Sequence, residues 1–192
     1  SIQSIQHSLI AGVDMIYHAE YSDEKTLDML EEAKDRVFVA PSISLFHTML
    51  NEGEAHGMPR VVAESMGIPA LIEESVKTHM ALRKRGIRHV IGGDYGFTWN
   101  MQGTNARDIQ HFIDYYGYTA ADALVCATRN GGLAMRGQGD LGTLQQGMLA
   151  DMLLVDGDPL KDAAVLTDKA RLVMIMKDGV IHSIAPSLQH KN

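Results

Sequence analysis

The sequence RHVIGGDYG, at residues 88–96, predicts a short buried strand that ends in a sharp turn. β-Branched residues favour strands, and the two glycines let the backbone turn where other residues would be strained. Asp94 therefore follows the carboxyl end of the predicted strand. Catalytic groups of α/β barrels lie at that end of the strands. A single carboxylate there more often caps the next helix, so the rest of the sequence has to decide between these roles.

Helical and strand-like patterns alternate on the amino-terminal side of this stretch. Helical spacing of apolar residues or a short β-branched run marks each segment. Helices are predicted at residues 3–12, 22–36 and 69–85, and strands at 13–17 and 37–40. This alternation is typical of parallel β/α units.

Residues 45–67 interrupt the alternation with Asn51, Gly53, Gly57 and Pro59. We expect an irregular insertion here, because long irregular segments after a strand often serve as substrate loops or lids. A plain surface excursion is the alternative. His47 lies in this segment and is a candidate substrate contact.

The composition changes after Arg136, where glycines separate short apolar runs. These runs, at residues 152–155, 172–176 and 180–184, predict strands of a small β unit. We therefore place a domain boundary near residue 137, with residues 1–136 in one unit and 137–192 in the other. Residues 187–192 are expected to be a frayed tail.

Composition excludes several classes of function. The chain has 192 residues with 17 Lys and Arg against 24 Asp and Glu, a net charge of −7, and no basic stripe, so nucleic-acid binding is not expected. No apolar run approaches the roughly 20 residues of a membrane helix. The single cysteine, Cys126, is expected to be a buried small residue and suits a reducing, cytoplasmic setting.

The sequence LGTLQQGMLADMLLVDGDPL at residues 141–160 closely resembles the carboxyl-terminal signature of the metal-dependent amidohydrolase superfamily. Residues 128–134 are similar to the helix that precedes this signature, although Arg129 and Gly132 depart from its pattern. Asp151 and Asp156 correspond to structural positions of the signature. Within the superfamily, the imidazolonepropionase-like branch, which includes Xaa-Pro dipeptidases, is the most similar.

The resemblance implies a fold. Residues 13–19, 37–42 and 90–94 would be strands 6, 7 and 8 of a (β/α)8 TIM barrel, and the carboxyl-terminal runs would be strands of a small β-sandwich. The expected class is thus α/β, the carboxyl-terminal portion of such a barrel followed by part of a sandwich. The eighth strand of the family usually ends in G-T-D, and Gly93 here replaces the Thr.

The resemblance also implies a chemistry. His18 and Asp94 would bind a divalent metal, with zinc expected as one ion or two, and Asp94 would act as the catalytic proton shuttle. Metal-activated water would then hydrolyse the C–N bond of a dipeptide-like or N-acyl small substrate. The alternatives are a carbamate or urea hydrolase, a deaminase, or a non-catalytic barrel relative that acts as an interaction partner.

Residues near the expected strand ends are candidates for contacts with the substrate. An aromatic-rich loop follows Asp94 and suits an apolar acyl group, although packing within the loop is equally consistent with its composition. The candidates are Tyr95, Phe97, Trp99 and Asn100, together with Tyr21 and His47.

Two ligands are too few for a catalytic zinc site, which usually takes three protein ligands and water. The other histidines do not provide an H-x-H or H-x-x-x-H pair; His79 and His111 are expected to be surface or packing residues, and His89 to be partly buried beside a backbone partner. A complete barrel also needs about 250 residues. We therefore expect the missing half of the barrel, on the same or a separate chain, to be a partner, in a homo-oligomeric enzyme.

Overall fold

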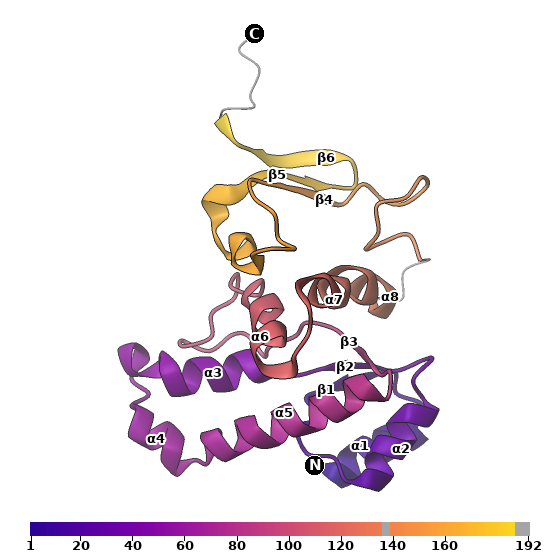
Figure 1. Ribbon diagram of the computed structural model, residues 1–192, viewed down its shortest axis with the longest axis vertical. Coiled ribbons are helices and arrows are strands. Elements are labelled where there is room, and N and C mark those ends of the chain that lie inside the picture. The colour runs from indigo at the N-terminus through magenta and orange to yellow at the C-terminus, as the bar shows by residue number, and fades with distance from the viewer. Residues whose placement is uncertain (136–138, 187–192) are drawn as a thin grey trace.

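The computed structural model describes residues 1–135 and 139–186. Helices and strands alternate along the amino-terminal part, and a small sheet forms the carboxyl-terminal part (Figure 1). The elements are α1 Ile2–Ile10, β1 Met15–Tyr17, α2 Glu24–Glu32, β2 Phe38–Ala40, α3 Ile43–Asn51, the 3-10 turn η1 Gly53–His56, α4 Arg60–Ser65, α5 Ile68–Lys84, β3 Arg88–His89, α6 Arg107–Tyr116, α7 Ala120–Val125, the π-helical turn η2 Cys126–Asn130, α8 Gly131–Ala134, β4 Met152–Val155, the 3-10 turns η3 Ala163–Thr167 and η4 Lys169–Arg171, β5 Leu172–Lys177 and β6 Val180–Ile184.

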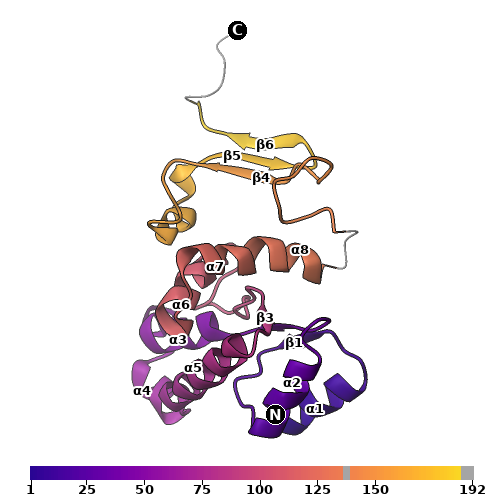
Figure 2. The ribbon, with the colours of Figure 1, turned by 45° about the vertical axis from the view of Figure 1, so that its right-hand side comes forward.

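β1, β2 and β3 form a parallel sheet in that order, with Tyr17 opposite Ala40 and Val39 opposite His89. Because the strands are parallel, their carboxyl ends share one edge of the sheet. Helices α1, α2 and α5 lie together beside the sheet (Figures 1 and 2). Leu30 and Leu82 from these helices are fully buried against Val39 of β2. The predicted β/α alternation is confirmed.

The carboxyl-terminal strands form a separate antiparallel sheet in the order β4-β5-β6, as the glycine-punctuated runs predict. It lies at the opposite end of the molecule from α1 (Figure 1). Helix α8 is joined closely to the segment before this sheet, because a Cβ on Gly132 would come within 2.5 Å of the carbonyl oxygen of Leu141. This contact explains the glycine that departs from the family pattern. The predicted boundary at residue 137 and the tail at 187–192 lie outside the described residues.

The prediction of an irregular insertion at residues 45–67 is wrong. This segment is mostly helical, since it contains most of α3, η1 and α4. Its glycines and proline fall between the helices, and the helices bury Leu45, Met49 and Ala63 in a common cluster with Ile68. Tertiary packing thus outweighs the local breaker residues.

Two histidines form a buried hydrogen-bonded chain with a tyrosine. His79 Nδ1 lies 3.0 Å from His89 Nε2, and the Tyr118 hydroxyl lies 2.8 Å from His89 Nδ1. The ring of His89 therefore has side-chain partners, not the backbone partner expected, and it is 1% exposed, not partly buried. His79 is likewise a packing residue. Among the described residues, no helix has the length and apolar character needed to cross a membrane.

These histidines make stability sensitive to acid. Burial lowers the pKa of His89 and of His111 to about 3, and burial together with His89 lowers the pKa of His79 well below its usual value. Unfolded histidines have a pKa near 6.5, so below that pH the unfolded chain binds protons that the native protein does not. Native stability is therefore retained above about pH 6.5 and lost as the pH falls toward 3.

We expect the free energy of unfolding to fall by roughly 1 kcal/mol for each of His89 and His111 between pH 7.5 and 5.5, and to fall further because of His79. Urea unfolding monitored by circular dichroism at the two pH values measures this loss. The exposed His182 provides the control, because His182→Gln should leave the pH dependence unchanged while His111→Gln reduces it. Equal stability at both pH values would contradict burial of the neutral imidazoles.

Candidate functional site

His18 directly follows β1, and its N–H donates to the carbonyl of Ala40 in β2 at 2.7 Å. Its backbone and that of Ala19 have positive φ angles of 82° and 66°. Such angles are strained for residues with a Cβ and tend to occur at functional sites. The Nδ1 atom of the His18 ring is buried and has no hydrogen-bond partner among the described residues. The backbone of His18 is therefore fixed to β2, and one ring nitrogen is available to a ligand.

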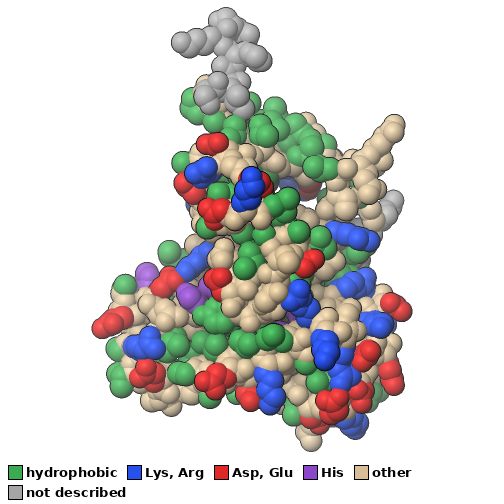
Figure 3. Space-filling model, in the orientation of Figure 1, with side chains coloured by type: hydrophobic (Ala, Val, Ile, Leu, Met, Phe, Trp, Pro, Cys, Tyr) green, Lys and Arg blue, Asp and Glu red, His purple; other side chains and the backbone are tan. Residues whose placement is uncertain are grey.

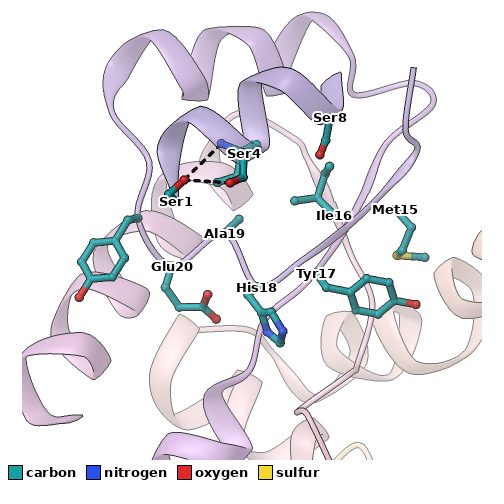
Figure 4. A pocket seen from close by; sticks show the side chains of 11 residues that line it. Ser1, Ser4, Ser8, Met15, Ile16, Tyr17, His18, Ala19 and Glu20 are labelled. Carbon is teal, nitrogen blue, oxygen red and sulfur yellow. Dashed lines mark hydrogen bonds between the residues drawn. The ribbon is translucent and has the colours of Figure 1, made fainter. Parts of the chain in front are cut away.

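Glu20 secures this segment to the neighbouring strand. Its carboxylate accepts hydrogen bonds from the N–H and the hydroxyl of Ser42 at 3.0 and 2.7 Å, and it is 6% exposed. Figure 4 shows the side chains of Glu20 and His18 next to each other in a cavity at the end of β1, which also includes Tyr17 and Tyr21. Sequence reasoning did not single out Glu20. No motif marked it, since its partner Ser42 lies 22 positions away.

Asp94 follows β3 by five positions on the same edge as His18, and it has a φ angle of 57°. The predicted strand through residue 94 is too long: β3 ends at His89, and Val90 makes one further backbone bond to Val39. The N–H groups of Gly92 and Gly93 instead donate to the carboxylate of Asp108, which draws the chain out of the sheet.

Asn100 secures the same loop from its other side. Its amide donates to the carbonyls of Gly93 and Asp94 at 2.8 and 2.9 Å, and its Oδ1 accepts from the Ser44 hydroxyl at 3.1 Å. The side chain is 0% exposed. This geometry favours a positioning role for Asn100 over the substrate contact expected from the sequence.

Asp108, in the first turn of α6, is a second site residue that the sequence does not single out. Its Oδ2 accepts from the N–H groups of Gly92 and Gly93 at 3.0 and 2.8 Å, and the residue is 0% exposed. Burial raises the pKa of Asp108 to about 6, while the Tyr95 hydroxyl and the two glycine N–H groups lower it. In the sequence, an acidic residue at a helix start could not be told from one that only favours the helix dipole.

The position that the family usually fills with Thr requires glycine in this chain. A Cβ on Gly93 would come within 2.5 Å of both the Asp108 carboxylate and the Ser44 side chain. Asp108 and Ser44 therefore occupy the space that a Thr side chain at residue 93 would need.

The aromatic candidates surround this loop in different ways. Phe97 is 42% exposed and stacks on Trp99 with ring centroids 5.6 Å apart, and Tyr21 after β1 is 50% exposed. Trp99 also packs against the cluster that contains Leu45 and Ile68. Burial raises the pKa of Tyr95. Their contact with substrate stays a prediction, with Phe97 and Tyr21 the most accessible.

His47 lies on α3, on the side that faces α6. Its Nδ1 is 2.7 Å from the Tyr115 hydroxyl, its Nε2 is 3.7 Å from Glu52, and its ring lies 4.5 Å from that of His111. Burial lowers the pKa of His47. Since both ring nitrogens face neighbouring side chains, this geometry favours a role in the contact between α3 and α6 over a substrate contact.

The donors at this edge fit part of a metal site. A buried imidazole nitrogen without a partner and a carboxylate on a held loop are the ligand types that zinc and similar ions prefer. In the described part of the chain, however, no three His, Cys, Asp or Glu side chains gather closely enough to hold a metal ion. The chain thus carries two candidate ligands of a site that needs more.

The sequence profile of the amidohydrolase family matches residues 7–182. The chain belongs to this family. Amidohydrolases are typically metal-dependent. An ochratoxinase of Aspergillus niger is 26% identical over 177 residues, which make up 91% of this chain and 35% of the ochratoxinase. The chain therefore spans about a third of the length of this relative.

Solved structures share the fold of this amidohydrolase chain. The A. niger ochratoxinase has a TM-score of 0.79 at 22% identity, over 95% of this chain and 40% of its own. A Xaa-Pro dipeptidase with bound methionine in the active site scores 0.77 at 23%, over 95% and 43%. A prolidase complexed with N-methylphosphonate-L-proline scores 0.80 at 22%, over 96% and 44%.

The close fit around Gly93 generates a stability prediction. Gly93→Ala should lower the free energy of unfolding by about 2 kcal/mol or more, because the new methyl group must displace the Asp108 carboxylate or Ser44. Gly131→Ala is the matched control: the nearest atom to its added Cβ is 3.9 Å away, and alanine is the better helix former. Chemical denaturation compares the two variants, and equal stability would show that the space at residue 93 is not as restricted as described.

Proposed function

We propose that this chain is part of a metal-dependent hydrolase that cleaves the C–N bond of an amide in a dipeptide-like or N-acyl small substrate. The observation that supports it most is the placement of His18 and Asp94 at one edge of a parallel sheet, each with a strained backbone, in an amidohydrolase fold. β1, β2 and β3 would then correspond to strands 6, 7 and 8 of the family barrel.

His18 and Asp94 would hold a divalent metal, with zinc the expected ion, in one or two copies. When bound, such a metal lowers the pKa of water and polarises the scissile carbonyl. The Asp94 carboxylate accepts the proton that the attacking water loses and returns it to the leaving nitrogen, as a general base and then a general acid. Glu20 and Asn100 keep the two strand ends in place during these steps.

The remaining ligands would come from a part of the barrel outside this chain, on the same or a separate polypeptide. Two surfaces support this proposal. β1 is an edge strand of its sheet, and its Tyr17 is 64% exposed. Hydrophobic side chains also gather over β6, where Val180 is 61% and Ile181 48% exposed (Figure 3). Unpaired edges and apolar faces of this kind are usually covered by further structure.

The substrate proposal rests on the accessible aromatic side chains near the site. Tyr21 and Phe97, from the loops after β1 and β3, offer an apolar lining for an acyl or amino-acid side chain. The ochratoxinase and the dipeptide-cleaving relatives among the comparisons agree with an amide of this type. A panel of N-acyl amino acids, Xaa-Pro dipeptides, carbamates and cyclic amidines would separate amide hydrolysis from the carbamate and deaminase alternatives.

Replacing the proposed ligands tests the function. Asp94→Asn in the complete zinc-loaded enzyme should lower kcat by roughly 10²–10⁴-fold, because the amide cannot accept the proton. Asparagine tolerates a positive φ angle as aspartate does, so the loop should persist. His18→Ala should release bound zinc. Steady-state kinetics and elemental analysis of the purified variants measure the two effects.

Matched controls lie on the same chain. Asp114→Asn, on the exposed side of α6, and His182→Ala, on β6, change the same residue types away from the site and should leave turnover and zinc content unchanged. If Asp94→Asn and His18→Ala behave like these controls, the proposed site is wrong. If no amide in the panel is cleaved but zinc binds, the class of substrate is wrong.

A further inference from the structure

The loop that carries Asp94 depends on one buried carboxylate. The N–H groups of Gly92 and Gly93 both donate to Oδ2 of Asp108. Consecutive N–H groups of a strand point to opposite sides, so two that converge on one oxygen require the backbone to leave the strand conformation. The sheet accordingly ends at Val90, and Asp94 reaches its φ angle of 57° four residues later.

The carbonyl groups of the same segment also accept hydrogen bonds. Asn100 donates to the carbonyls of Gly93 and Asp94, and the N–H of Leu45 donates to the carbonyl of Gly93 at 3.2 Å. A left-handed backbone costs about 1–2 kcal/mol for a residue with a Cβ. It persists only where surrounding contacts oppose its relaxation. Asp108 supplies the two charge-assisted bonds of this set, which are roughly twice as strong as neutral ones.

Burial of the Asp108 carboxylate lowers the stability of the folded protein. The residue is fully buried, and burial raises its pKa to about 6. A carboxylate whose pKa is raised by burial destabilises the folded protein at neutral pH. Gly93 leaves the space that this carboxylate occupies, since a Cβ there would collide with it. A buried carboxylate that lowers stability, together with a glycine that leaves room for it, indicates a role beyond packing.

We propose that Asp108 is a positioning residue for Asp94, whose carboxylate holds the Gly92–Gly93 backbone so that Asp94 keeps the left-handed conformation from which it serves the metal site. This inference rests on the proposed function of Asp94. It assigns Asp108, which accepts hydrogen bonds from the loop backbone, a share in metal affinity and turnover.

Zinc affinity of the complete enzyme tests the proposal, by competition with a chelator. Asp108→Ala should weaken zinc binding by about 10–100-fold and lower kcat with little change in KM, as loss of an outer-shell partner does. Asp108→Asn should restore most of both, because its amide oxygen can accept from the same two N–H groups. Leu82→Ala, in the core cluster of α5, is the stability control and should leave zinc affinity unchanged.

A second readout follows the loop itself. The amide proton signals of Gly92 and Gly93 should lie downfield in the native protein, and those of both residues should move upfield in Asp108→Ala. If this variant does not fold, Asp108→Ser, which keeps an acceptor hydroxyl, replaces it, with a smaller loss of zinc affinity expected. Zinc affinity within twofold of the native value in a folded variant, or an equal loss in Leu82→Ala, would overturn the positioning role.

The same experiments separate this inference from the proposed function. If Asp94→Asn abolishes turnover while Asp108→Ala and Asp108→Ser leave affinity and kcat unchanged, only the positioning role of Asp108 fails. If Asp94→Asn itself has no effect on zinc or turnover, the proposed function fails, and the assignment of Asp108 fails with it.

Discussion

The requirement that buried backbone N–H groups find an acceptor shapes the site more than any other constraint. At the end of β3, the N–H groups of Gly92 and Gly93 have left the sheet, with Gly93 buried and Gly92 partly buried. The Asp108 carboxylate accepts both. Without this acceptor, the chain would either continue along β2 or leave two donors unpaired. The conformation of Asp94 depends on this replacement of backbone hydrogen bonds between strands by hydrogen bonds to the Asp108 side chain.

Hydrogen bonds that involve buried polar side chains link the ends of all three strands. Glu20, after β1, accepts from Ser42, after β2. Ser44, two residues further, donates to Asn100, which in turn holds the Asp94 loop. A parallel sheet brings the strand ends together, but only roughly. The buried polar bonds between neighbouring loops fix the angles of the individual residues, including the strained backbones of His18 and Asp94.

The described part of the chain holds two candidate metal ligands and no group of three His, Cys, Asp or Glu side chains that could hold a metal ion. The backbone of each candidate ligand is held by hydrogen bonds within this chain. Under the proposed function, the edge strand β1 and the exposed apolar side chains of β6 are the places where further structure would join. The profile match over residues 7–182 establishes the family.

The sequence by itself determined the alternation of helices and strands, the separate carboxyl-terminal sheet and the family, because apolar periodicity and the motif at residues 141–160 are local patterns. It also made His18 and Asp94 candidates, because the resemblance to the family places both at the ends of predicted strands. It did not determine the helices at residues 45–67, where packing of Leu45 and Met49 outweighs the glycines. Nor did it identify Asp108, Glu20 or the hydrogen bonds by which Asn100 holds the Asp94 loop. Their partners lie up to 56 positions away, and only the tertiary structure brings such groups within hydrogen-bonding distance.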